Sequence, residues 1–95
     1  MEISWSPDAL DRLDDIGDYV AKDSRERAEA FVERLIKSVD HLKDFPASGT
    51  VTPEHQAFRH VVLQSYRVIY RLHSDKIEIV TGVGPGQLFR APEEA

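Results

Sequence analysis

Apolar residues recur at helical spacing in two stretches of the first half of the chain. Residues 7–22 carry one apolar stripe with the three-to-four spacing of a helix face: Leu10, Leu13, Ile16 and Val20. Residues 24–42 carry a longer stripe with the same spacing: Ala28, Phe31, Val32, Leu35, Ile36, Val39 and Leu42. Ser6 and Ser24 precede these stretches and are suited to cap helices. The pattern predicts two amphipathic helices with a short connection, packed as an antiparallel hairpin.

Alternating and β-branched residues predict strands in the rest of the chain. Residues 2–5 form one short strand, and residues 57–63, 66–72 and 76–83 form three more, with turns at 64–65 and 73–75. The predicted fold class is therefore α+β, in the order strand, helix, helix, strand, strand, strand. The helical hairpin should pack on an antiparallel meander of the last three strands.

The run YRVIYR at residues 66–71 should be the central strand of this meander. Its alternation places Val68 and Tyr70 on one face and Arg67 and Arg71 on the other. We expect the first face to meet the helices and the second to be a surface for a macromolecule. In the last strand, strict alternation places Ile77, Ile79 and Thr81 on the helix-facing side and Glu78, Val80 and Gly82 on the opposite side.

Length and composition indicate a single domain over residues 1–95, with room for one core. The tail from about residue 88 to 95 is expected to be flexible. The chain has no cysteine, no secretory leader pattern and no apolar run near the roughly 20 residues that span a membrane. We therefore expect a cytoplasmic protein that does not contact membranes.

Charge is distributed unevenly along the chain. The net charge of −5 argues against bulk binding of nucleic acid. Residues 58–73, however, contain three arginines and no acidic residue. This locally basic sheet could face nucleic acid, an acidic protein partner, or only the acidic helices beside it.

Few residues have the spacing of a known catalytic or metal site. None of the four histidines forms a helical i, i+4 pair with another, and the glycine-rich segment 82–86 lacks the lysine of a phosphate loop. No nucleophile signature is present. The four aspartates of the first helix are better explained as a solvated face than as a cation site. We therefore expect no metal and no cofactor.

The arginines of the sheet are the best remaining candidates for function. Arg67 and Arg71 share one strand face, and Arg59 lies on the neighbouring strand. A guanidinium binds phosphate or carboxylate and can stabilise charge on a reacting phosphate. Equally, these arginines could keep an exposed sheet face soluble, paired with Glu78. Glu54, at the end of the proline-containing loop 45–54, is a candidate general base if it lies near them.

These residues together resemble the RelE/ParE superfamily of bacterial toxins from type II toxin–antitoxin modules. The resemblance covers about residues 3–83 and rests on the WSP start at 5–7, the two helices, the FPASG segment at 45–49 and the YRVIYR strand. The long hairpin and the Phe-Pro-x-x-Gly loop resemble the ParE branch more closely. The resemblance implies a RelE-like fold and a cognate antitoxin that wraps the toxin in a hetero-oligomer.

The resemblance also implies a choice of targets. ParE members poison DNA gyrase, whereas RelE members cleave mRNA on the ribosome with basic residues and sometimes a glutamate base. Here Arg67 matches the strand arginine and Glu54 the glutamate. The histidine and basic residues usual after the last strand are replaced by Gly84-Pro85-Gly86-Gln87. This departure removes the general acid and favours a ParE-like protein over an mRNA endoribonuclease.

Three hypotheses follow for function. The favoured one is a ParE-like toxin that binds a protein target, with gyrase the first candidate. The second is a ribosome-dependent mRNA endonuclease that uses Glu54 and Arg67 as catalytic residues. The third is a degenerate, non-toxic member that only binds its antitoxin. The candidate residues for binding target or antitoxin are Arg59, Arg67, Arg71 and Gln87, and an acidic antitoxin tail should cover some of the arginines.

Overall fold

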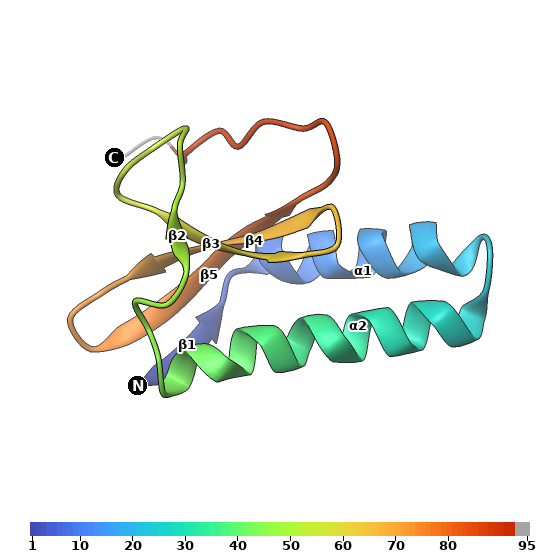
Figure 1. Ribbon diagram of the computed structural model, residues 1–95, viewed down its shortest axis with the longest axis horizontal. Coiled ribbons are helices and arrows are strands. Elements are labelled where there is room, and N and C mark those ends of the chain that lie inside the picture. The colour runs from blue at the N-terminus through green and yellow to red at the C-terminus, as the bar shows by residue number, and fades with distance from the viewer. Residues whose placement is uncertain (93–95) are drawn as a thin grey trace.

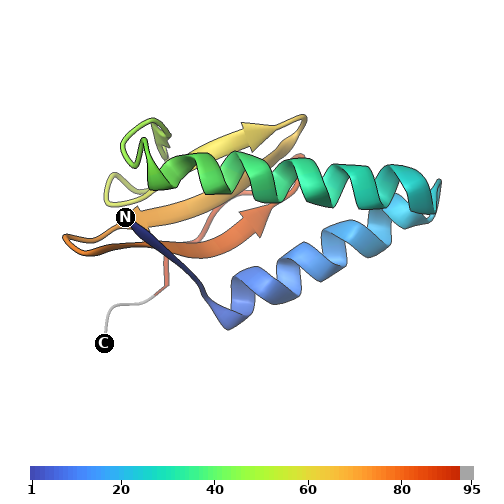
Figure 2. The same ribbon diagram turned by 90° about the horizontal axis from the view of Figure 1, so that it is seen from below.

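The computed structural model describes residues 1–92, which form two helices and a five-stranded sheet. The elements in chain order are β1 Glu2–Trp5, α1 Pro7–Ala21, α2 Arg25–Asp40, the 3-10 turn η1 His41–Lys43, β2 Thr50–Val51, β3 Arg59–Leu63, β4 Tyr66–Leu72 and β5 Lys76–Val83. The two helices lie side by side along one face of the sheet, and their connecting end projects beyond it (Figures 1 and 2). The predicted α+β class and helical hairpin are confirmed.

The sheet is mixed, with strand order β1-β5-β4-β3-β2. The predicted meander of β3, β4 and β5 is antiparallel, as expected. The first strand, β1, adds to β5 in parallel. Residues 45–54 are predicted to form a loop, but β2 within this segment pairs with β3. A two-residue strand is too short to produce an alternation that the sequence could reveal.

Both predicted helix starts are confirmed by capping contacts. The Ser6 hydroxyl accepts a hydrogen bond from the Ala9 amide at 3.0 Å and donates one to the Val80 carbonyl at 2.8 Å. The Ser24 hydroxyl accepts one from the Arg27 amide at 3.3 Å. Ser6 therefore both caps α1 and joins its start to β5. Neither helix within residues 1–92 is long and apolar enough to cross a membrane.

The main core lies between the helical hairpin and the sheet. The sheet contributes the predicted residues Val68, Tyr70, Ile77 and Ile79. The helices contribute Ala9, Ile16, Phe31, Leu35 and Val39, with Leu42 at the end of the hairpin. Tyr70, Ile77 and Ile79 are completely buried. This face follows the period-two pattern of the strands and the helical stripe of α1 and α2.

A second, smaller cluster covers the opposite face of the sheet, where the sequence analysis allowed for no core. It contains Phe58, Ile69, Val80, Val83 and Phe89. The segment that follows β5 crosses this face and contributes Phe89, which is only 5% exposed (Figure 1). The tail expected to be flexible from about residue 88 is thus packed at Phe89, while residues 93–95 lie outside the described part.

A bulge explains why Val83 belongs to the second cluster. The β4–β5 register shifts between Ile69 and Tyr70, because Ile69 pairs with Thr81 whereas Tyr70 pairs with Ile79. Val80 is the extra residue, so the alternation reverses after it. The strict alternation predicted for residues 81–82 is therefore wrong. Gly82 faces α1, where a Cβ atom would lie 3.3 Å from Cδ1 of Ile16.

Candidate functional site

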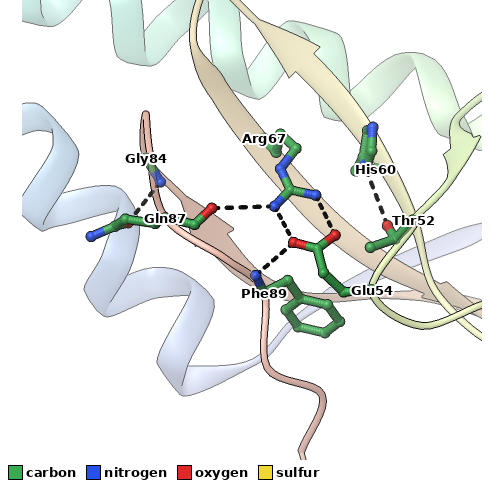
Figure 3. Close-up of polar contacts among 7 residues, drawn as sticks. All are labelled: Thr52, Glu54, His60, Arg67, Gly84, Gln87 and Phe89. Atoms are coloured by element: carbon green, nitrogen blue, oxygen red, sulfur yellow. Dashed lines mark hydrogen bonds and ion pairs between the residues drawn. The ribbon is translucent and has the colours of Figure 1, made fainter.

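An ion pair between Glu54 and Arg67 lies on the sheet face opposite the helices. Arg67 Nη1 donates to Glu54 Oε1 at 2.9 Å, and Nη2 donates to Oε2 at 2.6 Å. The two side chains are only 18% and 17% exposed. Arg67 is the second residue of β4 and Glu54 lies in the loop after β2, so the structure brings together the two candidate catalytic residues (Figure 3).

The same carboxylate also holds the segment that follows β5. The Phe89 amide donates to Glu54 Oε2 at 2.8 Å, and Arg67 Nη2 reaches the Gln87 carbonyl at 3.5 Å (Figure 3). The Phe89 ring packs edge-on against Phe58, with ring centroids 5.1 Å apart. We call the segment 84–92 the C-terminal strap, and the three residues Glu54, Arg67 and Phe89 the clamp.

The clamp sets the protonation of Glu54. The hydrogen bonds from Arg67 and then from the Phe89 amide lower the pKa of this carboxyl from 4.5 to about 2. A general base works best when its pKa lies near the working pH. At neutral pH Glu54 is an ionised ion-pair partner with little tendency to accept a proton. Its geometry is thus that of a structural contact rather than of a poised base.

His60 and Thr52 lie beside the clamp, and neither was a candidate from sequence. Thr52 is 1% exposed, and its hydroxyl lies 3.1 Å from His60 Nδ1. Burial lowers the pKa of His60, and the charge of Arg67 lowers it further. The charge of Glu54 opposes this shift, but the net effect favours the neutral form of His60. The sequence did contain a hint of His60, because this residue directly follows the candidate Arg59 in the predicted strand 57–63.

The three candidate arginines do not form one patch. Arg59 pairs with Tyr70 across β3 and β4, so it lies on the helix-facing side of the sheet. There it donates to the carbonyls of Ala47 and Gly49 at 3.2 and 2.8 Å. Arg71 lies on the clamp side, with its guanidinium 5.5 Å from the centre of the Phe58 ring. The basic run in the sequence is therefore divided between two faces.

The Phe-Pro-x-x-Gly loop is fixed by a buried tyrosine. The Tyr70 hydroxyl donates to the Pro46 carbonyl at 2.8 Å and accepts from the Gly49 amide at 3.0 Å. Burial raises the pKa of Tyr70, so the hydroxyl keeps its proton. A Cβ atom at position 49 would lie 2.5 Å from the Tyr70 oxygen. Glycine is needed here because the loop backbone approaches the tyrosine so closely.

Gln87 acts locally in the strap. Its side-chain oxygen accepts from the Gly84 amide at 2.8 Å (Figure 3). The same oxygen accepts from Arg12 Nη2 at 3.1 Å. Arg12 also donates from Nε to the Gly82 carbonyl at 3.1 Å. Gln87 thus closes the turn after β5 and connects it to α1. Its predicted role in binding a target or antitoxin remains a prediction, as do those of Arg59, Arg67 and Arg71.

Metal ligation finds no support in the part of the chain that the structure describes. Residues 1–92 contain no group of three or more histidine, aspartate or glutamate side chains placed to hold a metal ion. The aspartates of α1 are exposed along the helix.

Comparison with known proteins identifies the family. The family model for the ParE toxin of the type II toxin–antitoxin system parDE matches residues 3–87. A relative in Sinorhizobium fredii, named "Putative toxin Y4kP", is 40% identical over 81 residues, which cover 83% of this chain and 82% of that protein. A solved structure described as the chromosomal ParDE toxin–antitoxin system from P. aeruginosa matches with a TM-score of 0.77 at 25% identity, covering 90% of this chain and 96% of the other. This chain belongs to the ParE toxins of type II toxin–antitoxin systems.

Proposed function

We propose that this ParE-type toxin inhibits growth by binding a protein target, with DNA gyrase the first candidate, and that a cognate antitoxin neutralises it. The gyrase target comes from the resemblance to the ParE branch. The observation that favours binding over RNA cleavage is the ion pair between Glu54 and Arg67.

The ion pair engages both residues that the nuclease hypothesis needs. Glu54 accepts three hydrogen bonds and has a pKa of about 2, so it is a poor proton acceptor at neutral pH. Arg67 uses both terminal nitrogens on the same carboxylate. An arginine that stabilises a reacting phosphate must present those nitrogens to the substrate. Catalysis by this pair would first require the clamp to open.

The proposal is tested by three assays on the purified chain and on cells. Induced expression should arrest growth, and the purified protein should inhibit DNA supercoiling by gyrase. Incubation with translating ribosomes should leave mRNA intact. Ribosome-dependent cleavage that disappears in Arg67→Ala would contradict the proposal and restore the endonuclease hypothesis. Expression without any growth defect would favour a member that only binds antitoxin.

The antitoxin is tested through the neighbouring reading frame. Co-expression of a small protein encoded beside the toxin should restore growth and yield a stable hetero-oligomer. We expect that partner to lay a helix or strand over the toxin. Any acidic segment that covers Arg67 must compete with Glu54, which already accepts hydrogen bonds from both terminal nitrogens of the guanidinium. If the neighbouring protein neither binds nor rescues growth, this part of the proposal fails.

A further inference from the structure

An apolar groove runs along the outer side of the helical hairpin, on the far side of the sheet from the clamp. It has a volume of about 540 Å³ and is open to solvent. The residues that line it are Gly17, Ala21, Arg25, Ala28, Glu29, Val32, Glu33 and Ile36. None of these was a candidate in the sequence analysis, and neither the strap nor the sheet covers the groove.

Small residues create the groove. Gly17 lies so close to α2 that a Cβ atom there would be 3.3 Å from Cγ2 of Val32. Ala21 on α1 and Ala28 on α2 also line the groove, nearer the connection between the helices. Further along, Ile36 is 45% exposed. Leu10, seven residues before Gly17 and thus on the same helix face, is 50% exposed. The apolar surface therefore extends over several turns, which suits an amphipathic helix.

Acidic residues border this apolar surface on both helices. Glu29 and Glu33, one turn apart on α2, line the groove itself. Asp14, three residues before Gly17, is exposed on the same side of α1. Glu33 has a lysine partner, Lys37, at 3.6 Å, in a pair where both side chains are more than two-thirds exposed. Arg25, near the connection, is the one basic residue that lines the groove.

We infer that the outer groove of the hairpin binds a basic amphipathic helix of another protein. The apolar stripe of such a helix would lie against Ala21, Val32 and Ile36, while its lysines or arginines would meet Glu29 and Glu33. A second copy of this chain is a poor occupant, because it would bring the same acidic residues against one another. The inference does not depend on gyrase being the target, since it follows from the shape and charge of the groove alone.

Two synthetic peptides of about 14 residues, or four helical turns, provide the test. Both carry the same leucine stripe at helical spacing, and one has lysine and the other glutamate at all remaining positions. Fluorescence anisotropy of the labelled peptides should show that the wild-type chain binds the lysine peptide at least about tenfold more tightly than the glutamate peptide. The double substitution Glu29→Lys and Glu33→Lys should lower lysine-peptide affinity about tenfold and raise that of the glutamate peptide.

A charge-matched variant separates the groove from overall charge. Glu2→Lys with Asp75→Lys changes the net charge by the same amount on exposed positions of β1 and of the β4–β5 turn. It should shift peptide affinity by about twofold or less, because charges beyond a Debye length are screened. Ile36→Ser should weaken both peptides. Circular dichroism and thermal melting verify that each variant is folded.

Three outcomes would overturn the inference. The wild-type chain could bind both peptides equally, or the control variant could lose as much affinity as the groove variant. Sedimentation could also reveal a dimer that the substitutions at Glu29 and Glu33 alter, which would mean that a second copy occupies the groove. Failure of the gyrase or antitoxin assays would leave these peptide results unaffected.

Discussion

The two faces of the sheet are closed in different ways. The helix-facing side is closed by two long amphipathic helices whose apolar stripes cover four sheet residues of regular alternation. The opposite side is closed by a short loop and a strap without helix or strand, joined by one ion pair and one small apolar cluster. Burial on the first face is spread over many side chains, whereas closure of the second depends on a few contacts. We therefore expect the second face to open at lower free energy than the first.

The largest effect should come from truncating the main core. Leu35→Ala, at a side chain 2% exposed on α2, should destabilise the fold by about 2–5 kcal/mol. Phe89→Ala removes a larger side chain that is 5% exposed. We expect the strap around it, which has no helix or strand, to detach without unfolding the rest. We expect a smaller loss for Phe89→Ala than for Leu35→Ala in urea unfolding. If Phe89→Ala loses as much stability as Leu35→Ala or more, the two faces of the sheet do not differ in how easily they open.

A substitution at Gly49 should be nearly as severe. In Gly49→Ala the new Cβ would lie 2.5 Å from the Tyr70 oxygen and 2.9 Å from the His60 carbonyl oxygen, so the backbone must shift. Strain of this kind costs about 1–3 kcal/mol. The double variant with Tyr70→Phe should recover part of the loss, because the nearest clashing atom is gone. Thermal melting of both single variants and the double variant checks this coupling.

Glu54 should give the second face its own pH dependence. Its pKa in the folded chain, about 2, lies below the ordinary value of 4.5. The ion pair therefore contributes its full stability above about pH 4.5 and loses it as the pH falls through 2. Urea midpoints of wild type and Glu54→Gln should differ at pH 7 and converge toward pH 3. If the difference between the two urea midpoints stays constant with pH, the charge of Glu54 contributes nothing to stability.

The smallest effect on stability should come from removing the Ser24 cap at the start of α2. Ser24→Ala removes an exposed cap with a 3.3 Å hydrogen bond and should cost about 0.5–1 kcal/mol. Ser6→Ala should cost somewhat more, because the Ser6 hydroxyl also bonds to β5 at Val80. Chemical unfolding of the two variants compares the stability lost with the Ser24 cap, which bonds only within its helix, with that lost with the Ser6 cap, which also bonds to the sheet. Equal losses would show that the second hydrogen bond adds nothing.

The sequence predicts those parts of the fold that depend on the local spacing of apolar residues. The stripes of both helices, apart from the half-exposed Leu10 and Ile36, and the inward-facing Val68 and Tyr70 follow from spacing alone. Neighbours within a few residues determine each of these faces. Thr81 and Gly82 were misplaced because a single extra residue at Val80 reverses the alternation, and a bulge has no signature in residue type here.

The clamp was only partly accessible from sequence. Arg67 follows from the alternation of its strand, Glu54 is a candidate by its place at the end of a loop, and both match the family pattern. The structure places them in contact. Their third partner, the Phe89 amide, is 35 residues from Glu54 and is a backbone group, so no side-chain motif could identify it. The separation of Arg59 from the other arginines likewise depends on strand register, which a run of basic residues cannot reveal.

The parallel pairing of β1 with β5 has a consequence for synthesis of the chain. Ser6, at the end of the first strand, bonds to Val80, 74 positions later. Closing so long a loop is entropically costly and slows folding. On the ribosome the first strand and the start of α1 have no sheet partner until β5 has been made. The sheet therefore completes only after β5 has been made, and a chain that stops before residue 76 lacks the strand on which its own first residues pair.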